Sequence, residues 1–205
     1  SLQSIATVWN RVNNKLFANS AQGSNSMLTV SVAGTNGKGS CVMAMESILQ
    51  AHGYLVGTYT SPHLFHYNER IRVSGAPVSD EIIVEAFEFI ESECKSIALT
   101  YFEYSTLAAL WIFETLAVQV RLLEVGLGGR LDAVNIVSPD VAVITSIALD
   151  HQYWLGSTKA DIAVEKLGIT RTEKPLIWGE RSSSGLDELL IPTGAVLYRL
   201  GIEFD

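Results

Sequence analysis

The sequence has few cysteines, and their spacing argues against two kinds of cross-linked site. Only two occur in 205 residues, Cys41 and Cys94, and they are far apart in the chain. We therefore expect neither a disulfide framework nor a zinc site of the usual C-x-x-C spacing. Such sparse cysteine usage is typical of a reducing compartment, and we expect a cytoplasmic protein.

Basic residues are also scarce, and no apolar run is long. Lys and Arg number 14 against 22 Asp and Glu, which gives a formal net charge of −8. This balance disfavours a protein that clamps the nucleic-acid backbone over its whole surface. No apolar run reaches the roughly 18 residues of a membrane span, and the N-terminal stretch SLQSIATVWNRVNN lacks the layout of a signal sequence. Small molecules are the expected partners, with no nucleic acid and no membrane.

What the sequence does have is enough apolar side chain for a buried core. Hydrophobic residues make up 48% of the chain and charged residues 18%. These proportions are typical of a folded globular domain rather than of a disordered or fibrous chain. The length favours one domain, or slightly more than one.

Strand and helix patterns alternate from residue 28 onward. Apolar and β-branched runs predict strands at 28–33, 54–60, 71–75, 121–125, 140–147 and 175–180, with a further short segment at 196–204. Helical spacing of apolar residues predicts helices at 38–52, 82–94, 104–117 and 162–166. This alternation predicts an α/β fold, a three-layer α/β/α sandwich with a mostly parallel sheet.

A glycine-rich segment follows the first predicted strand. It reads Gly34-Thr35-Asn36-Gly37-Lys38-Gly39-Ser40 and leads into the predicted helix. Glycines let successive N–H groups converge on phosphate oxygens, and the helix N-terminus and Lys38 add positive charge. The spacing departs from G-x-x-x-x-G-K-[ST], because Val32 stands where the first glycine belongs and Gly39 follows the lysine. The segment could be a plain strand-to-helix turn, but its context favours phosphate binding.

Two further polar groups follow predicted strands. Glu124 lies at the end of one apolar run, where a carboxylate is costly unless it is paired or binds a metal. Asp150 and His151 follow another, and a histidine that stood there alone would more often be a hydrogen-bonded core residue. Ligands gather at the carboxyl ends of strands in such folds. A divalent-ion site is therefore the favoured interpretation, although histidine is an unusual ligand for Mg²⁺.

Six motifs together resemble one family. SVAGTNGKGS, TSPHL with NERIRVSG, LTYFEY, LEVGLGGRLDAVNIV, ITSIALDH and VEKLGI occur in the order typical of the dihydrofolate synthase/folylpolyglutamate synthase family. That family belongs to the Mur-ligase-like ATP-dependent amide ligases, and its GTNGKG[ST] loop replaces the standard P-loop spacing. The motifs cover nearly all of residues 28–180. The resemblance therefore implies a P-loop-type, Mur-ligase-like ATPase domain.

The resemblance also implies roles for individual residues. The phosphates of ATP would be held by Thr35, Asn36, Gly37, Lys38, Gly39 and Ser40. Mg²⁺ would be held by Ser61, Glu124 and His151. The substrate, dihydropteroate or a folate, would be bound by Thr100, Tyr101, Phe102, Glu103, Leu131, Asp132 and Ala133. The residues implied to take part in catalysis are Lys38, His151 and Lys166, the last as a lysine that carries a carbamate.

The implied activity is an ATP-dependent amide ligation of folate biosynthesis, with ATP and Mg²⁺ as cofactors. The γ-phosphoryl group of ATP would convert the carboxylate of dihydropteroate or a reduced folate into an acyl phosphate. The amine of L-glutamate would then attack it to form the amide, with positioning and charge neutralisation supplied by the protein. Whether the protein makes dihydrofolate, extends the glutamate tail or does both stays open. We expect a monomer.

The chain departs from the family pattern in several places. It lacks the segment H-x-x-x-I-D-L-G-L-E-R-V before the glycine loop, so we expect either an interruption near Asn14 or a deletion. Val134 stands in place of a usual threonine, and Leu167 in place of a usual alanine beside Lys166. Residues 1–205 would be an incomplete N-terminal ATP-binding domain without the C-terminal glutamate-binding domain. We expect this polypeptide alone to have little or no ligase activity.

Three alternatives remain at this point. A Mur ligase of peptidoglycan precursor synthesis is disfavoured by LTYFEY and by SPHL followed by NERIRVSG. A P-loop NTPase that acts as a switch is disfavoured because no guanine-reading NKxD motif is found. A non-catalytic nucleotide-binding module would bind Mg-ATP and show no pteroate-dependent turnover.

Overall fold

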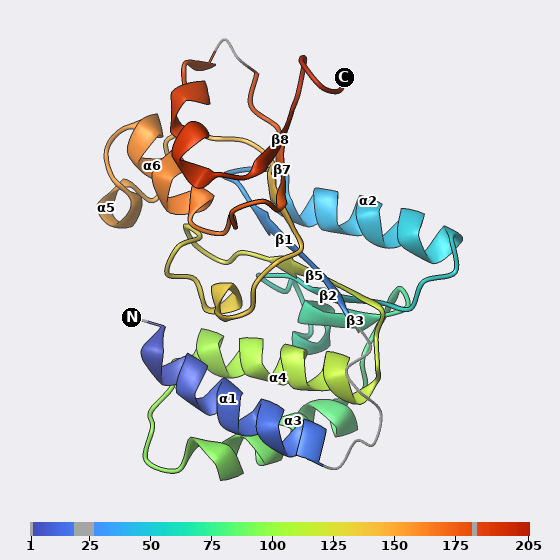
Figure 1. Cartoon of the computed structure of the whole chain (residues 1–205). Coiled ribbons are helices and arrows are strands. Elements are labelled where there is room, and N and C mark those ends of the chain that lie inside the picture. The colour runs from blue at the N-terminus through green and yellow to red at the C-terminus, as the bar shows by residue number, and fades with distance from the viewer. Residues whose placement is uncertain (1, 19–26, 182–183) are drawn as a thin grey trace.

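The computed structural model describes residues 2–18, 27–181 and 184–205 (Figure 1). The helices are α1 (Gln3–Ala18), α2 (Lys38–Ala51), α3 (Asp80–Cys94), α4 (Tyr101–Thr115), α5 (Gln152–Leu155) and α6 (Lys159–Leu167), with 3₁₀ turns η1 (Tyr67–Arg70), η2 (Ala133–Ile136), η4 (Asp187–Leu189) and η5 (Ile191–Thr193). The strands are β1 (Leu28–Ala33), β2 (Val56–Tyr59), β3 (Ile71–Val73), β4 (Ala76–Pro77), β5 (Val120–Glu124), β6 (Val141–Ile144), β7 (Pro175–Trp178) and β8 (Val196–Arg199). Every predicted strand and helix is present, with shifted ends.

One sheet forms the middle of the described part of the chain. Its eight strands run in the order β4-β3-β2-β5-β1-β6-β7-β8. β1 pairs in parallel with both β5 and β6, and the strands from β2 to β8 in this order are all parallel to their neighbours. At one edge of the sheet, β3 pairs antiparallel with both β2 and β4. The prediction of a mostly parallel sheet is confirmed.

Helices cover both faces of the sheet. α2 lies on one face, while α1, α3 and α4 lie on the other (Figure 1). The buried side chains divide accordingly, because Val42 of α2 packs in one core with Val32, Val56 and Leu122 of the sheet. A second, larger core contains Phe113 of α4 and the buried residues of α1 and α3. The three-layer α/β/α sandwich is therefore confirmed.

The start of α4 corrects the prediction that this helix begins at residue 104. The helix begins at Tyr101 because Thr100 and Glu103 form a capping box. The Thr100 hydroxyl accepts from the Glu103 backbone N–H at 3.3 Å, and the Glu103 carboxylate accepts from the Thr100 N–H at 2.8 Å. These bonds satisfy amides that have no partner within the helix. The aromatic motif 101–104 therefore forms the first turn of α4.

The N-terminal helix α1 was not among the predicted elements. Its apolar residues Ile5, Val8, Trp9 and Val12 recur at helical spacing and are buried against α3 and α4. The interruption expected near Asn14 is wrong, since Asn14 lies within α1. Residues 19–26, where the rest of that segment falls, lie outside the described residues. None of the helices described here has the length and apolarity needed to cross a membrane.

The topology brings three connections to one edge of the sheet. β1 lies between β5 and β6, and all three run in the same direction. The segments that leave their carboxyl ends are 34–37, 125–132 and 145–151. This edge is the place to look for a site. The segments contain the predicted functional residues Thr35, Asn36, Gly37, Leu131, Asp132 and His151, and they adjoin Lys38, Gly39, Ser40, Glu124 and Ala133.

Candidate functional site

The glycine-rich loop docks on the segment that follows β6. The Thr35 N–H donates to the Ser146 carbonyl at 2.8 Å, and the Thr35 hydroxyl accepts from the Ala148 N–H at 3.0 Å. The Thr145 hydroxyl donates to the Asn36 carbonyl at 2.7 Å. Gly34 has a φ of 149°, and a methyl group there would lie 1.9 Å from the Thr145 hydroxyl oxygen. Only glycine allows this approach, so the loop is held in one shape by its neighbour.

The same bonds decide which loop amides remain for a ligand. The N–H groups of Thr35 and Asn36 already donate to Ser146, at 2.8 and 3.2 Å. Gly37 then takes a left-handed φ of 84° and starts α2. The amides that follow belong to the first turn of α2, where N–H groups have no intrahelical partner and the helix dipole is positive. The exposed end of this turn is the part suited to phosphate oxygens.

Two lysines converge on a single loop carbonyl. The Lys38 ammonium donates to the carbonyls of Gly34 and Thr35 at 3.2 and 3.4 Å, and the Lys166 ammonium donates to Gly34 at 3.0 Å. Lys166 is only 5% exposed. Burial, reinforced by the nearby Lys38 charge and opposed by Asp150 and Asp132, lowers the pKa of Lys166 to about 8. An amine in this state is partly neutral at moderately alkaline pH.

A small cavity of about 30 Å³, which we call the lysine cavity, brings the three predicted catalytic residues together. Its lining includes Lys38, His151 and Lys166, with Asp150 beside them. His151 precedes α5 in a left-handed conformation with a φ of 48°, and its Nε2 lies 3.7 Å from the Asp150 carboxylate. A non-glycine residue held with positive φ is frequent at functional sites.

Glu124 lies at the end of β5, next to the first turn of α2. It is 5% exposed, and its carboxylate accepts from the Ser61 N–H at 3.0 Å. A methyl group at Gly39 would lie 3.7 Å from each of its two oxygens, so the carboxylate adjoins the first turn of α2. Burial raises its pKa, and backbone N–H groups and Lys38 oppose that rise. In the described part of the chain Glu124 forms no ion pair.

The predicted magnesium ligands are therefore only partly brought together. Ser61 and Glu124 are joined by a hydrogen bond, whereas His151 lines the lysine cavity, whose lining includes neither of them. Across residues 2–18, 27–181 and 184–205, no three His, Cys, Asp or Glu side chains form a group suited to a metal ion. A buried carboxylate with no cationic partner nevertheless suits a divalent ion that also takes phosphate oxygens and water.

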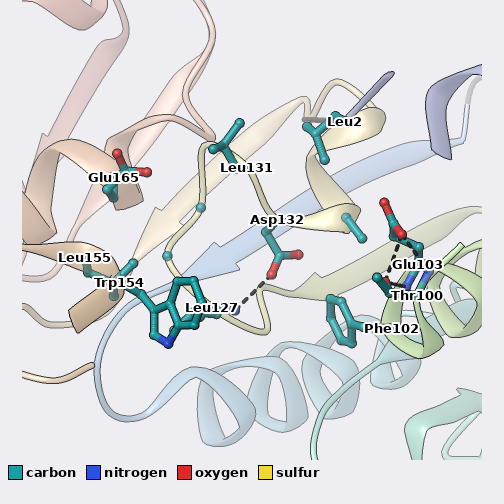
Figure 2. Close-up of a pocket in the computed structure, with 13 residues that line it drawn as sticks. Leu2, Thr100, Phe102, Glu103, Leu127, Leu131, Asp132, Trp154, Leu155 and Glu165 are labelled. Carbon is teal, nitrogen blue, oxygen red and sulfur yellow. Dashed lines mark hydrogen bonds between the residues drawn. The ribbon is translucent and has the colours of Figure 1, made fainter. Parts of the chain in front are cut away.

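A larger cavity of about 360 Å³ is drawn in Figure 2, and it shares lining residues with the lysine cavity. Its lining includes six of the seven predicted substrate residues: Thr100, Phe102, Glu103, Leu131, Asp132 and Ala133. Tyr101 is not among them. It is 61% exposed and lines a neighbouring cavity with Phe87 and Tyr104. The structure thus gathers six of the seven, and it places Tyr101 in the adjoining cavity.

Asp132 fixes the turn that forms one wall of the large cavity. Its carboxylate accepts from the Leu127 N–H at 2.9 Å and the Val134 N–H at 3.0 Å. Burial raises the pKa of Asp132 to about 6. The same turn lies against the ring of Phe102, because a methyl group at Gly126 would be 2.6 Å from the Phe102 Cζ atom. Glycine at this position lets the ring and the backbone meet.

The two cavities adjoin. Leu127, Gly128 and Leu155 line both of them. A ligand that fills the large cavity therefore ends near the two lysines and the glycine loop. This arrangement suits a reaction in which one end of an apolar molecule meets the phosphates of a nucleotide.

Several lining residues of the large cavity were missed at the sequence level. They are Leu2, Leu127, Gly128, Gly129, Trp154, Leu155 and Glu165. Trp154 could have been predicted, because this aromatic residue lies only three positions after His151 in the sequence. Leu2 could not, because it reaches the site only through the docking of α1 on α3 and α4.

Known proteins resemble the chain over most of its length. No family model matches it. The dihydrofolate synthase/folylpolyglutamate synthase of Escherichia coli (strain K12) is 53% identical over 175 residues, which are 85% of this chain and 42% of that protein. The folylpolyglutamate synthase of Lacticaseibacillus casei is 39% identical over 157 residues, which cover 73% of this chain and 37% of that protein. The chain thus spans less than half the length of these relatives.

Solved structures show the same likeness in three dimensions. E. coli FolC in complex with DHPP and ADP superposes with a TM-score of 0.89 at 47% identity, covering 98% of this chain and 47% of that one. This likeness in structure and sequence agrees with the ordered motifs, and the chain belongs to the dihydrofolate synthase/folylpolyglutamate synthase family of Mur-ligase-like proteins.

Proposed function

We propose that the protein represented by this chain is an ATP-dependent carbon–nitrogen ligase that adds L-glutamate to dihydropteroate, to reduced folates or to both. The observation that carries this proposal is the junction of the two cavities at Leu127, Gly128 and Leu155. An elongated acceptor in the large cavity would present its carboxylate to the glycine loop. The E. coli relative has been seen with DHPP and ADP, and a further relative with Mn, AMPPNP and L-glutamate.

The glycine loop and the first turn of α2 would hold the phosphates of ATP. The loop residues Thr35 and Asn36 secure its shape through Ser146 and Ala148, and the exposed first-turn amides and Lys38 would face the phosphate oxygens. Lys38 would exchange its present bonds to the Gly34 and Thr35 carbonyls for phosphate. The task of these groups is positioning and charge neutralisation.

Glu124 and Ser61 would hold Mg²⁺ beside these phosphates, and His151 would approach from the lysine cavity. The fit lies in the chemistry of Glu124, a buried carboxylate that meets only backbone N–H groups. When bound, Mg²⁺ neutralises charge on the transferring phosphoryl group. The bond from the Ser61 N–H fixes the Glu124 carboxylate, which would be the oxygen ligand of the ion on this side.

Lys166 is suited to carry a carbamate. Its lowered pKa increases the neutral amine fraction, and the neutral nitrogen is the form that attacks the carbon of CO₂, with loss of one proton. The product is an anion, so the repulsion between Lys166 and Lys38 would become an attraction. Lys166 lies at the junction of α6 with the loop, where such an anion can organise the cations of the site.

The large cavity would bind the acceptor. Phe102, Leu131 and Ala133 supply apolar walls, and the Asp132 carboxylate is the buried polar group among them. Glu103 accepts from the Thr100 N–H and hydroxyl through one carboxylate oxygen in the capping box, and its other oxygen would remain for the acceptor. Tyr101 would contribute from the adjoining cavity.

We further propose that residues 1–205 form an N-terminal ATP-binding domain, with the glutamate site in the remainder of the protein. In support, the chain matches 42% of the E. coli relative. A cytoplasmic location and a monomeric state are part of the same proposal. The free thiols of Cys41 and Cys94 are consistent with a reducing compartment.

The test is calorimetric titration of the chain with dihydropteroate and with a reduced folate, each in the presence of Mg-ATP. Binding of one or both acceptors is the expected result, and the preference between them shows which reaction the site serves. Binding of nucleotide with neither acceptor would instead indicate a nucleotide-binding module. Full ATP- and glutamate-dependent amide formation by the 205 residues would contradict the proposed division of the protein into two domains.

A further inference from the structure

Trp154 differs from the other tryptophans of the chain. It is 71% exposed, whereas Trp9, Trp111 and Trp178 are at most 7% exposed. It belongs to the short helix α5 and lines the large cavity (Figure 2). A large aromatic ring left in water beside a cavity is typical of a ligand contact rather than of a core residue.

A second aromatic ring lines the same cavity from a distant part of the sequence. Phe102 lies in the first turn of α4 and is fixed against the backbone of Gly126. Leu127 and Asp132 also line the cavity, and the four side chains are seen together in Figure 2. A volume of about 360 Å³ falls within the range of small-molecule sites, which are mostly apolar with a few polar groups. A cavity with aromatic rings from α4 and α5 suits a flat ligand.

We propose that Trp154 stacks on the planar ring system of the acceptor and determines which acceptors the site takes. This inference rests on the proposed function and adds a residue to it. The ligand class is a planar bicyclic heteroaromatic, such as a pterin. Stacking on an indole is favourable for any such ring, and Asp132 supplies the polar contact that stacking lacks.

The helix α5 links this contact to the lysine cavity. The N–H groups of Trp154 and Leu155 both donate to the His151 carbonyl, at 2.8 and 3.1 Å. Leu155 lines both cavities, and His151 lines the lysine cavity. A ring held against Trp154 therefore also fixes the turn from which His151 projects.

The test uses tryptophan fluorescence and calorimetry on the 205-residue chain, titrated with dihydropteroate in the presence of Mg-ADP. Because Trp154 is the exposed tryptophan, binding is expected to change the wild-type emission, and this change is lost in Trp154→Phe. Trp154→Phe keeps a ring and is expected to bind within about threefold of wild type. Trp154→Ala is expected to bind roughly 10- to 100-fold more weakly.

Tyr153→Ala is the matched control. Tyr153 is 90% exposed, lies on the same turn and lines neither of the two cavities. Its ring meets the Trp154 ring edge to face, with 5.1 Å between the centroids, so Tyr153→Ala also tests whether that contact is needed to hold Trp154. The affinity of Tyr153→Ala for dihydropteroate should lie within about twofold of the wild-type affinity, because substitutions of exposed residues usually have small effects. Wild-type affinity in Trp154→Ala, an unchanged emission response in Trp154→Phe, or an equal loss in Tyr153→Ala would overturn the inference and leave the proposed function standing. A wild-type chain that binds Mg-ADP but not dihydropteroate would overturn the proposed function and this inference with it.

Discussion

The two ends of the central strands treat buried charge differently. At the amino ends, the buried Arg121 guanidinium donates to Glu114 at 3.2 Å, and near it the more exposed Lys174 donates to Asp140 at 3.1 Å. At the carboxyl ends, the bonds of Glu124, Asp132 and Lys166 go to backbone groups.

This difference separates two uses of a buried charge. An ion pair neutralises both partners and leaves neither available to a ligand. A charge bonded only to backbone dipoles keeps most of its field for whatever binds beside it. The amino ends therefore serve stability, and the carboxyl ends retain unneutralised charge that the proposed function would use for phosphates, a metal ion and a carboxylate.

The largest expected effect is at the amino ends. Glu114→Ala leaves Arg121, which is 9% exposed, without its carboxylate. We expect a loss of about 3 kcal/mol in the free energy of unfolding, because an uncompensated buried charge is costly. Urea unfolding measures it. The control is Glu203→Ala, which breaks the more exposed Arg199 pair and should cost less than about 1 kcal/mol. Equal losses would remove the basis of the comparison.

The second effect tests the docking of the glycine loop. Gly34→Ala places a methyl group 1.9 Å from the Thr145 hydroxyl oxygen. We expect a loss of about 1–3 kcal/mol in unfolding free energy, together with weaker binding of Mg-ADP. Gly53→Ala is the control, since Gly53 also has positive φ, at 84°, but its added methyl group meets no atom within 4 Å. If Gly53→Ala impaired nucleotide binding as much, the close contact at Gly34 would not be what shapes the loop.

The third effect separates ligand binding from stability at the carboxyl ends. Glu124→Gln removes a charge that no basic side chain of the described residues neutralises, while an amide oxygen remains for the Ser61 N–H. The unfolding free energy is expected to change by less than about 1 kcal/mol. The Mg²⁺-dependent part of ADP affinity should fall at least about tenfold. A large loss of stability with unchanged Mg²⁺ dependence would contradict the assignment.

The smallest effect is a dependence of stability on pH. The pKa of Lys166 is about 8 in the folded chain against an ordinary value of 10.5. Between these values the unfolded chain binds the proton and the folded chain does not, so stability rises with pH through this window. Below about pH 8 both states are protonated, and the full cost of burying the charge is present. Urea unfolding from pH 7 to 10 should show this rise in wild type relative to Lys166→Met, and parallel curves would count against it.

Most of the fold could be predicted, because the spacing of apolar residues along the chain shows which faces of a helix or strand are buried. Runs such as 121–125 and 140–147 are apolar on both faces, and this pattern identifies central parallel strands. The end of β6 could not be predicted, because Thr145 and Ser146 leave the sheet to bond the glycine loop. The start of α4 was recoverable from Thr100 and Glu103, whose spacing is that of a capping box.

The site was predictable where residues close in sequence form it. The glycine loop and the turn 131–133 are contiguous motifs, and both reach the expected edge of the sheet. The partners that join these motifs were not predictable. Lys166 contacts Gly34, and Leu155 lines both cavities, through packing between segments that are far apart in the sequence.

The docking of α1 has a consequence for how this site can vary. Leu2 lines the large cavity, while at the other end of α1 the Lys15 ammonium pairs with Glu93 and the Arg11 guanidinium donates to the Glu93 carbonyl at 2.9 Å. Contacts with α3 thus fix the orientation of α1, and Leu2, directly before α1, forms part of the cavity wall. Substitutions at Arg11, Lys15 or Glu93 would therefore reach the wall of the large cavity through the orientation of α1, without altering any side chain that lines the cavity.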